Sequence, residues 1–358
     1  TLANLESTNI GANVSAEALS LASRITMNAH YGARTTPVYE NDPNRLVDWQ
    51  GYEPYPGCAY VANVGPGKPN ATITAGLAAL PPTLTGHSCV VIRDGATYAE
   101  QVTVKNFTNN GSSITILADA AAGLRPVVSP PLGSTAAFVI ANASVNVQGL
   151  YVLANQSVPY GVWASSGYVT ISSVVISTSG DLGIYAAGVR ISSWSVVSYS
   201  SVTVWNAHGF WLDGSTRTTV SYSTAVNKSA GSYAVYLDGG KNNAFTVLFA
   251  SNSHASGYGL YALGSDTNTV TQGTLWGGQF GAYFDNGSDY NAISLSTMVS
   301  ESNVGLFANG ADSNTVTQSY LWGDNAGAYL NTGSDFNAIS LSTMIGKTNF
   351  GLYANAAD

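Results

Sequence analysis

The sequence predicts an all-β fold: a single-stranded right-handed parallel β-helix (β-solenoid) with rungs of 22–26 residues and an N-terminal capping helix and arm. One supporting observation is a repeat with a fixed step of 23 residues, in the pattern Gly-(Ser/Ala)-Asp-X-Asn-(Thr/Ala)-(Val/Ile)-(Thr/Ser). The second supporting observation is the amino-acid composition. Only 9% of residues are charged, and side chains with hydroxyl and amide groups, which suit strands and turns, are abundant. Right-handedness follows from the general preference for right-handed parallel crossovers.

Three segments are expected along the chain. Residues 1–60 read as an irregular N-terminal arm with a short helix over 15–27. Residues 61–135 hold the N-terminal cap and the first rungs, and residues 136–358 hold the regular repeats.

The cap is expected to begin with a helix over 72–80, which the two prolines that follow it would end. Strands are expected next over 88–92, 101–104 and 113–117, so that the β-helix proper runs from about residue 85 to the end. A helix laid over the first rung would hide an open sheet edge.

From residue 137 onward each rung is counted on a small residue that is followed by an apolar and an aromatic position. These markers are Ala137, Gly161, Gly183, Gly209, Ala234, Gly259, Gly281, Gly305, Gly327 and Gly351. Positions one and three after the marker point the same way in a strand and alternate large-small with small-large, as in Leu306/Ala308 and Ala328/Leu330. Stacked volumes of this kind fill a narrow core, so these positions should face inward.

The residue between them should then face outward, as a column of rings. The column is Tyr261, Tyr283, Phe307, Tyr329 and Tyr353. Placing the rings inside instead would leave the alternating volumes unexplained. With Trp276 and Trp322, which recur two rungs apart, the column could stack on sugar rings, stack only on itself, or contact another subunit, and the sequence leaves these three open.

The repeat also aligns one column of amides and one of carboxylates. The columns are Asn268, Asn291, Asn314 and Asn337, and Asp266, Asp289, Asp312, Asp335 and Asp358. We expect the asparagines to form an inward hydrogen-bonded ladder and the aspartates to make turns. No cofactor is expected. The alternative is Ca²⁺ bound along the aspartate column, because a row of like charges costs stability unless cations screen it.

The best local catalytic candidates are Asp213 and Asp238, at the same place in adjacent rungs, with Arg217, Lys241 and His208 nearby in the sequence. Two stacked carboxylates repel each other, which raises one pKa as acid–base catalysis can require. The competing interpretation is that both belong to Asp-Gly turns, and we favour it.

Charge and cysteine content restrict the partners and the compartment. The net charge of −8 argues against nucleic acid, and no apolar run is long enough to span a membrane. The chain has two cysteines, Cys58 and Cys89. An even count in a chain of secreted type favours one disulfide and an extracellular or cell-surface location, with buried thiols as the alternative.

The opening of the chain resembles a known family. The helical segment 72–80 and the stretch Cys89-Val-Val-Ile-Arg-Asp-Gly-Ala-Thr-Tyr-Ala-Glu-Gln-Val resemble the start of pectin-lyase-like right-handed β-helix proteins. The later Asn-Thr-Val-Thr-Gln-Ser rungs resemble repeat regions of bacterial cell-surface proteins. The resemblance implies the fold over residues 61–358. It transfers no reaction, because the superfamily holds both enzymes and adhesins.

The residue sets of its enzymes are not found in this sequence. The Gln-Asp pair of pectin esterases, for instance, would need an acid where Gly149 follows Gln148. We therefore expect an extracellular structural or adhesive solenoid, a fibre subunit that associates end to end with copies of itself, without activity on pectic polymers. The alternative is a protein that binds or degrades polysaccharide.

Overall fold

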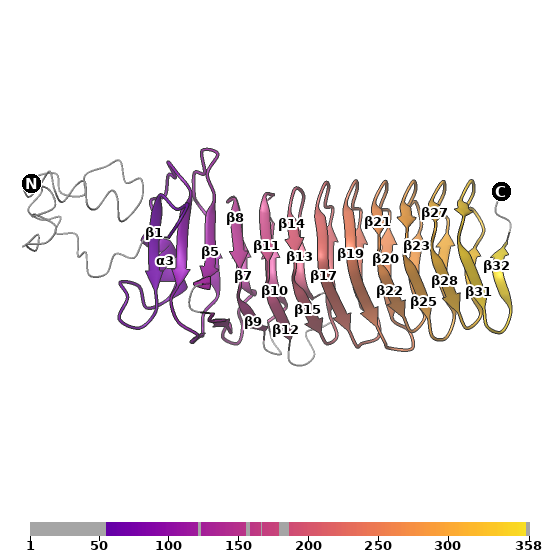
Figure 1. The fold of residues 1–358 in the computed structure, drawn as a ribbon, viewed down its shortest axis with the longest axis horizontal. Coiled ribbons are helices and arrows are strands. Elements are labelled where there is room, and N and C mark those ends of the chain that lie inside the picture. Colours follow the sequence, from indigo (N-terminus) through magenta and orange to yellow (C-terminus); the bar gives the residue numbers. More distant parts are fainter. Residues whose placement is uncertain (1–54, 121–122, 155–157, 166, 179–185, 356–358) are drawn as a thin grey trace, which may run out of the picture.

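The computed structural model describes residues 55–120, 123–154, 158–165, 167–178 and 186–355. Successive turns of the chain stack side by side into an elongated coil in which every strand pairs in parallel with the strand one turn away (Figure 1). This is the right-handed parallel β-helix that the repeat predicts. The helix expected over 15–27 and most of the arm lie outside the described residues.

Two sheets make up the coil. The eleven-stranded sheet contains β4 (Val102–Val104), β7 (Ala136–Ile140), β10 (Tyr160–Ala164), β13 (Ala187–Ile191), β16 (His208–Asp213), β18 (Tyr233–Asp238), β20 (Tyr258–Leu263), β23 (Phe280–Asp285), β26 (Val304–Asn309), β29 (Ala326–Leu330) and β32 (Phe350–Ala354). The twenty-one-stranded sheet begins with β1 (Tyr60–Val64), β2 (Ser88–Ile92), β3 (Thr97–Tyr98), β5 (Ile114–Ala118), β6 (Val127–Val128), β8 (Val145–Gln148), β9 (Tyr151–Ala154), β11 (Val169–Ser172) and β12 (Val175–Thr178). It continues with β14 (Val196–Ser198), β15 (Ser201–Val204), β17 (Thr219–Asn227), β19 (Ala244–Asn252), β21 (Thr269–Thr271), β22 (Thr274–Gly277), β24 (Ala292–Ser294), β25 (Thr297–Ser300), β27 (Thr315–Thr317), β28 (Tyr320–Gly323), β30 (Ala338–Ser340) and β31 (Thr343–Gly346).

The larger sheet bends and so covers two of the three faces of the coil. Strand β17 pairs with β14 through its first half and with β15 through its second half. The bend is made by single residues with left-handed backbone, such as Tyr222 (φ 47°), Val247 (φ 50°) and Gln272 (φ 54°). One such residue per turn changes the chain direction without a loop, which keeps the rungs short.

The core lies inside the coil and confirms the predicted strand parity. Leu260, Ala282, Leu306 and Ala328 stack in register on neighbouring turns and are all buried. Large and small side chains alternate along this stack, so each leucine fills the space that the adjacent alanine leaves. The rings between these positions therefore face outward.

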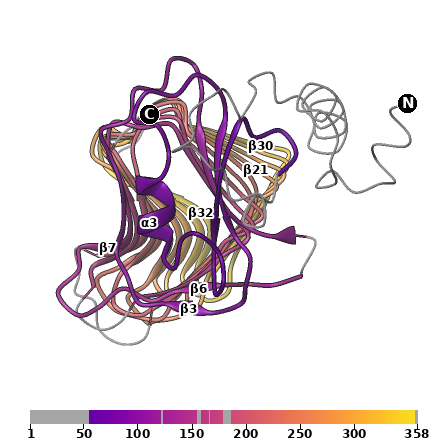
Figure 2. The same ribbon diagram turned by 90° about the vertical axis from the view of Figure 1, so that its left-hand side faces the viewer.

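At the N-terminal end, the helix expected over 72–80 forms as α3 (Ile73–Ala78) (Figure 2). The Thr72 side chain accepts a hydrogen bond from the N–H of Ala75, and the Glu100 carboxylate accepts the N–H groups of Ile73 and Thr74. Ile73 and Leu77 are buried in the core. These contacts supply the capping that the first turn of a helix lacks.

Strand pairing begins earlier than the expected position near residue 85. Strand β1 pairs with β2 from Tyr60↔Ser88 to Val64↔Ile92. Residues 61–135 were placed in the cap and first rungs, but no strand was named before the helix over 72–80. The apolar residues of β1 are buried only when β2 lies beside them.

One rung marker was wrong. Gly188, not Gly183, stacks between Gly161 and Gly209, because Val189 pairs with both Val162 and Phe210. Gly183 lies outside the described residues. Gly183 is followed in the sequence by an apolar and an aromatic residue, as the marker pattern requires, whereas Gly188 is followed by Val189 and Arg190, so the pattern favoured the wrong glycine. The consequence is that Arg190, two residues after Gly188, occupies the ring column at this turn.

Candidate functional site

The outer surface of the eleven-stranded sheet carries three side-chain columns, which we call together the aromatic face. The first column holds His208, Tyr233, Tyr258 and Phe280. The second holds Trp163, Arg190, Trp211, Tyr236, Tyr261, Tyr283, Phe307, Tyr329 and Tyr353. The third is polar and holds Asp213, Asp238, Asp285, Asn309 and Asn331, interrupted by Leu263.

The rings of the two aromatic columns pack on one another along and across the turns. Ring centroids are 5.5 Å apart for Tyr236 and Tyr261, 5.3 Å for Tyr261 and Tyr283, and 5.0 Å for Phe280 and Phe307. Most of these rings are therefore half-buried, and His208, Trp211 and Phe280 are buried. The second column points outward, as expected. Its rings also stack on one another, which was one of the three roles that the sequence left open, and this stacking covers much of their surface.

Burial also affects the tyrosine hydroxyls. It raises the pKa of Tyr233 to about 12, with smaller contributions from Tyr258 and Asp285. The pKa values of Tyr236, Tyr261 and Tyr283 are raised as well, chiefly by burial. The Tyr261 hydroxyl donates a hydrogen bond to Asp285 over 2.9 Å. The face thus keeps neutral hydroxyl groups beside a column of carboxylate and amide oxygens.

Arg190 stands in the second column between Trp163, one turn earlier, and Trp211, one turn later. Its guanidinium donates to the Asp213 carboxylate and, over 3.0 Å, to the hydroxyl of Tyr160. It also stacks 4.2 Å from the centre of the Trp211 ring. The sequence reasoning missed this residue because the rung was counted from Gly183, and counting from Gly188 would have found it.

The structure brings Asp213 and Asp238 together, as expected, in register on β16 and β18. Burial raises the pKa of Asp238, and the neighbouring charge of Asp213 adds to this, while Tyr236 and Arg190 act in the opposite direction. Each aspartate also precedes a glycine with positive φ, Gly214 (55°) and Gly239 (64°), so both residues end a strand at a turn.

The other catalytic candidates divide between two places. His208 lies on the aromatic face, where its Nδ1 atom accepts the N–H of Tyr233 and its ring packs against Trp211. Arg217 instead stacks on Trp194, and Lys241 pairs with Asp266. Arg217 and Lys241 come after the turn that ends the strand, so the contacts found for them are not with the carboxylate pair.

We expect Asp238→Asn to raise the melting temperature at pH 7. A carboxyl group whose folded-state pKa is raised stabilises the fold most at low pH and loses that contribution as pH rises through the raised pKa. Asparagine stays neutral, so the gain should appear at pH 7 and vanish near pH 3, where the aspartate is protonated too. The matched variant Asp213→Asn should lower the melting temperature at pH 7, because it removes the partner of Arg190. Equal melting curves for wild type and Asp238→Asn at pH 7 would contradict the assignment.

The two tryptophans grouped with the ring column lie elsewhere. Trp276 (on β22) and Trp322 (on β28) stand in register with Val299 between them, on the larger sheet. The Trp276 indole N–H donates to Glu301 over 3.0 Å. Fifteen residues separate Trp276 from Tyr261, and the chain passes a corner in between, so these rings face another side of the coil.

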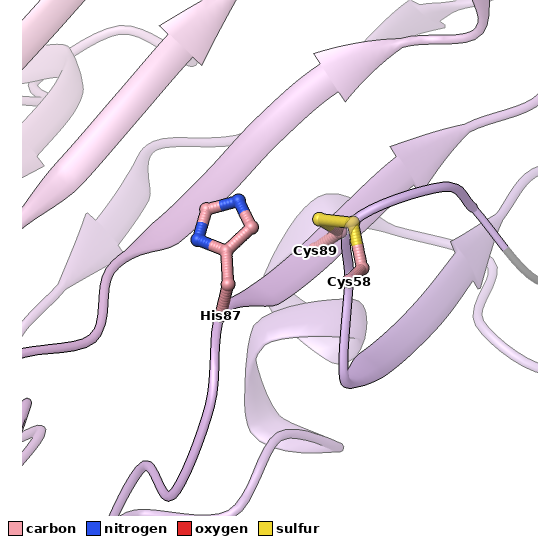
Figure 3. A group of neighbouring side chains, drawn as sticks. All are labelled: Cys58, His87 and Cys89. Carbon is pink, nitrogen blue, oxygen red and sulfur yellow. A yellow bond between two sulfur atoms is a disulfide. The ribbon is translucent and has the colours of Figure 1, made fainter. Parts of the chain in front are cut away.

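The two cysteines form a disulfide between the residue two before β1 and the second residue of β2. The His87 ring lies beside it (Figure 3). The potential ligand atoms of Cys58, His87 and Cys89 all lie within 4.8 Å of one another, and no other group of three Cys, His, Asp or Glu side chains in the described part of the chain has this geometry.

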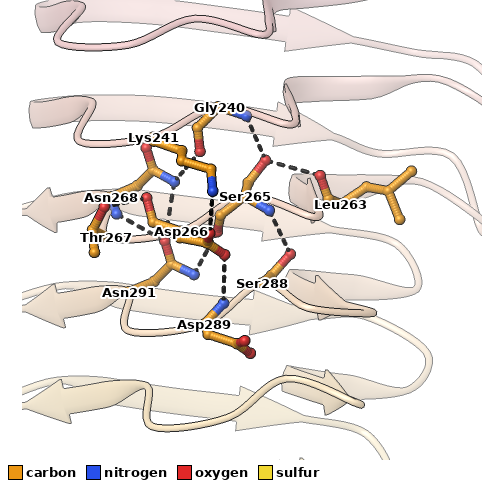
Figure 4. Close-up of polar contacts among 10 residues, drawn as sticks. All are labelled: Gly240, Lys241, Leu263, Ser265, Asp266, Thr267, Asn268, Ser288, Asp289 and Asn291. Atoms are coloured by element: carbon orange, nitrogen blue, oxygen red, sulfur yellow. Dashed lines mark hydrogen bonds and ion pairs between the residues drawn. The ribbon is translucent and has the colours of Figure 1, made fainter.

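The asparagine column lies inside the coil and bonds from turn to turn (Figure 4). Asn268 donates from both its backbone N–H (2.9 Å) and its amide (3.1 Å) to the Oδ1 atom of Asn291. Asn291 makes the same pair of bonds to Asn314, and Asn243 continues the column one turn earlier. Each amide thereby satisfies a buried backbone group of its neighbour.

The aspartate column bonds in the same direction at the surface. Oδ1 of Asp266, Asp289 and Asp312 each accepts the backbone N–H of the next aspartate along the column, over 2.7–3.2 Å. Lys241 pairs with Asp266 over 2.8 Å. This role for the carboxylates needs no cation, and Ca²⁺ binding at the column stays a prediction.

Comparison with known proteins identifies the family. Residues 169–358, more than half of the chain, match the family described as "Periplasmic copper-binding protein (NosD)". The chain belongs to the NosD family. A search of curated proteins found no match. None of the helices in the described ranges has the length and apolar character needed to span a membrane.

Solved structures at low identity share the coil. A structure titled "Geobacillus virus E2 - ORF18" has a TM-score of 0.54 at 11% identity, covering 80% of this chain and 56% of that chain. This chain thus spans little more than half of the viral protein, and the likeness shows the fold alone. The pectate lyase Pel9A (TM-score 0.45, 15% identity, 84% of this chain and 78% of that chain) and the periplasmic alginate epimerase AlgG (0.44, 10%, 77% and 66%) are also similar.

The family's description raises the question of whether this chain's residues fit copper. Copper(I) takes Cys, Met and His ligands. Within the segment that matches NosD, His208 and His254 bond to local groups, and Met298 and Met344 pack in or against the core. They form no ligand cluster among the described residues. Cys58, His87 and Cys89 are suitable donors, but they lie before the matched segment and their sulfurs are joined.

Proposed function

We propose that this NosD-family protein is an adhesive β-solenoid that works outside the cytoplasm and binds a polysaccharide along its aromatic face. The observation that carries the proposal is the pair of ring columns running from turn to turn with an edge of carboxylates and amides. Flat rings cover the apolar faces of pyranose sugars, and the polar edge bonds their hydroxyl groups. A linear array of this kind suits a linear polymer.

The charges on the face favour a neutral polysaccharide. Three aspartates lie along its polar edge, Asp213, Asp238 and Asp285. The one guanidinium in the ring column, Arg190, is already paired with Asp213. A uronic acid polymer would bring its own carboxylates next to these acids, which costs free energy at short range. Neutral sugar hydroxyls can instead donate to the aspartates.

The compartment is inferred from two observations. The chain contains a disulfide, which persists in oxidising environments. The family to which it belongs is described as periplasmic. Two narrower expectations from the sequence belong to this proposal: that copies of the protein associate end to end as a surface fibre, and that the protein does not cleave the polysaccharide it binds.

We expect Tyr261→Ala to weaken binding of a neutral polysaccharide about tenfold, because it removes a ring at the centre of the face. The probes are soluble β-1,3-glucan, mannan and xyloglucan, with polygalacturonate as the acidic comparison, in affinity electrophoresis. The control is Tyr290→Asn, since Tyr290 is an exposed ring at a corner of the larger sheet with a φ of 56°, a conformation that asparagine tolerates.

The proposal is supported if a neutral polymer retards the migration of the wild type, if Tyr261→Ala weakens this retardation, and if Tyr290→Asn leaves it unchanged. Migration unaffected by all three neutral polymers, or equal loss in both variants, would reject the aromatic face as the site. Reducing ends released from a bound polymer would show that the protein is an enzyme.

A further inference from the structure

The bend of the larger sheet carries a row of exposed side chains, one from each of seven successive turns, which we call the corner ridge. Its members are Tyr199, Tyr222, Val247, Gln272, Leu295, Gln318 and Leu341. Each member follows a residue that pairs with the neighbouring turn, so the side chains stack in register. The corner ridge belongs to the larger sheet and is therefore separate from the aromatic face.

Apolar side chains at these positions do not help a single chain to fold. All members of the ridge have left-handed backbone, with φ of 47–54°. Glycine and asparagine adopt this conformation easily, whereas it is unfavourable for valine, leucine and tyrosine. Leu295 is 52% exposed and Val247 is 38% exposed, so both bury little apolar surface against their own chain. A continuous row of exposed apolar groups marks a contact with another molecule.

The strands on both sides of the corner ridge carry no charged side chain. The ten-residue stretches 195–204, 218–227, 243–252, 268–277, 291–300, 314–323 and 337–346 contain no Asp, Glu, Lys, Arg or His. They lie on seven successive turns, and we call the surface that they form the neutral band. Phe249, Trp276, Tyr320 and Ile345 add exposed apolar side chains to it.

We propose that two copies of this chain associate side by side and antiparallel through the neutral band, with their corner ridges in contact around a two-fold axis at Leu295. The proposal goes beyond polysaccharide binding and does not depend on it. It also differs from end-to-end association, because it uses the side of the coil and closes at two copies.

The order of residues along the ridge is self-complementary. A two-fold axis brings residue i of one copy to residue j of the other, and j to i. Turn by turn, the ridge reads Val247, Gln272, Leu295, Gln318 and Leu341, which is apolar, amide, apolar, amide, apolar. Antiparallel packing about Leu295 therefore places Gln272 of one copy against Gln318 of the other. Each amide can both donate to and accept from its partner.

The spacing and the size of the band also suit a second copy. Both coils repeat at the strand spacing of ~4.8 Å, so the same contact recurs at every turn without a loss of register. Seven turns of ten residues give a surface of about 30 Å in each direction along its contour. A stable interface needs about 800 Å² from each partner, which is less than this surface offers.

Charge favours a second copy over a charged partner. Two copies that each carry a net charge of −8 repel one another, and the neutral band lets them meet without bringing carboxylates together. The other corner of the larger sheet differs, because Asp266 and Asp289 directly precede its left-handed residues Thr267 and Tyr290. A charged partner would find no opposite charge on the band.

The first experiment measures the mass of the full chain by sedimentation over concentrations from about 1 µM to about 1 mM. We expect a dimer that does not grow further. Gln272→Glu/Gln318→Glu should weaken the dimer at least about tenfold, because like charges then face each other across the axis. Gln272→Glu/Gln318→Lys should restore it, because each glutamate then faces a lysine. The matched control is Thr267→Glu/Ser313→Glu, which adds the same charge with the same two-turn spacing at the other corner and should leave the dimer unchanged.

The second experiment tests the position of the axis. Leu295→Cys should form a disulfide between two copies on mild oxidation, since the residue meets itself there. The two native cysteines are already joined to each other, so they do not compete. Thr267→Cys should give no such product. Far-UV circular dichroism should show that every variant keeps its β structure.

A chain that stays monomeric up to the highest concentration overturns the proposal. So does an equal loss of association in the ridge variant and in the control, which would mean that overall charge and not the ridge controls it. Species that grow beyond the dimer and are insensitive to Gln272→Glu/Gln318→Glu would show end-to-end association instead. A dimer that Gln272→Glu/Gln318→Lys fails to restore would rule out the antiparallel arrangement.

Discussion

Leu306→Ala should lower the free energy of unfolding by about 2–5 kcal/mol, because it leaves a cavity in the core that neighbouring side chains do not fill. Leu306 is 2% exposed and stacks between Ala282 and Ala328, whose small side chains cannot move in to fill the space. The measurement is urea denaturation followed by far-UV circular dichroism.

The neighbouring variant Phe307→Ala is the matched control, because it removes a larger side chain from the opposite side of the same strand. The Phe307 ring packs on the outside against Phe280 and Tyr329, at centroid distances of 5.0 and 5.1 Å. Its loss should cost about 1–2 kcal/mol. A larger loss for Phe307→Ala than for Leu306→Ala would mean that the outer ring packing, and not the inner core, dominates stability.

Asn291→Ala should destabilise the coil by about 2–5 kcal/mol, since each buried polar group left without a partner costs about 1–3 kcal/mol. Asn291 is 2% exposed, and its Oδ1 atom accepts both donors of Asn268, while its amide donates to the carbonyl of Ser265 over 2.8 Å. Alanine would leave the backbone N–H of Asn268 and the carbonyl of Ser265 unpaired.

The control for this variant is Asn355→Ala, an exposed asparagine whose amide donates to Asn331 over 3.2 Å. Solvent can replace that bond, so the cost should stay below about 1 kcal/mol. The comparison is again made by urea denaturation. Similar midpoints for Asn291→Ala and wild type would show that the inner ladder is dispensable for stability.

Much of the fold could be predicted because the repeat is written directly in the sequence. A step of 23 residues fixes the length of a turn, and alternating volumes such as Leu306 beside Ala328 fix which side of the strand faces inward. Both arguments use only steric fit between side chains one turn apart. They hold wherever successive turns have nearly equal length.

The candidate site was predicted less completely, because it depends on which residues stack where the turns are unequal. Gly188 lies 27 residues after Gly161 and 21 before Gly209. The marker pattern instead picked Gly183, which is followed by an apolar and an aromatic residue, and so missed Arg190. Arg217 and Lys241 were grouped with the aspartates because they are close to them in sequence, but they come after the turn that ends the strand and contact other residues.

The sequence by itself thus determined the coil, its rung length and the side of the strand that faces the core, since these follow from a regular period. Only the tertiary structure decided that Arg190 meets Asp213 and Trp211, and that Trp276 and Trp322 face another side from the tyrosines. It likewise decided that His87 lies beside the two cysteines. The physical reason is that hydrogen bonds between turns fix the register of stacking, and they join residues more than twenty positions apart, beyond the reach of any local pattern.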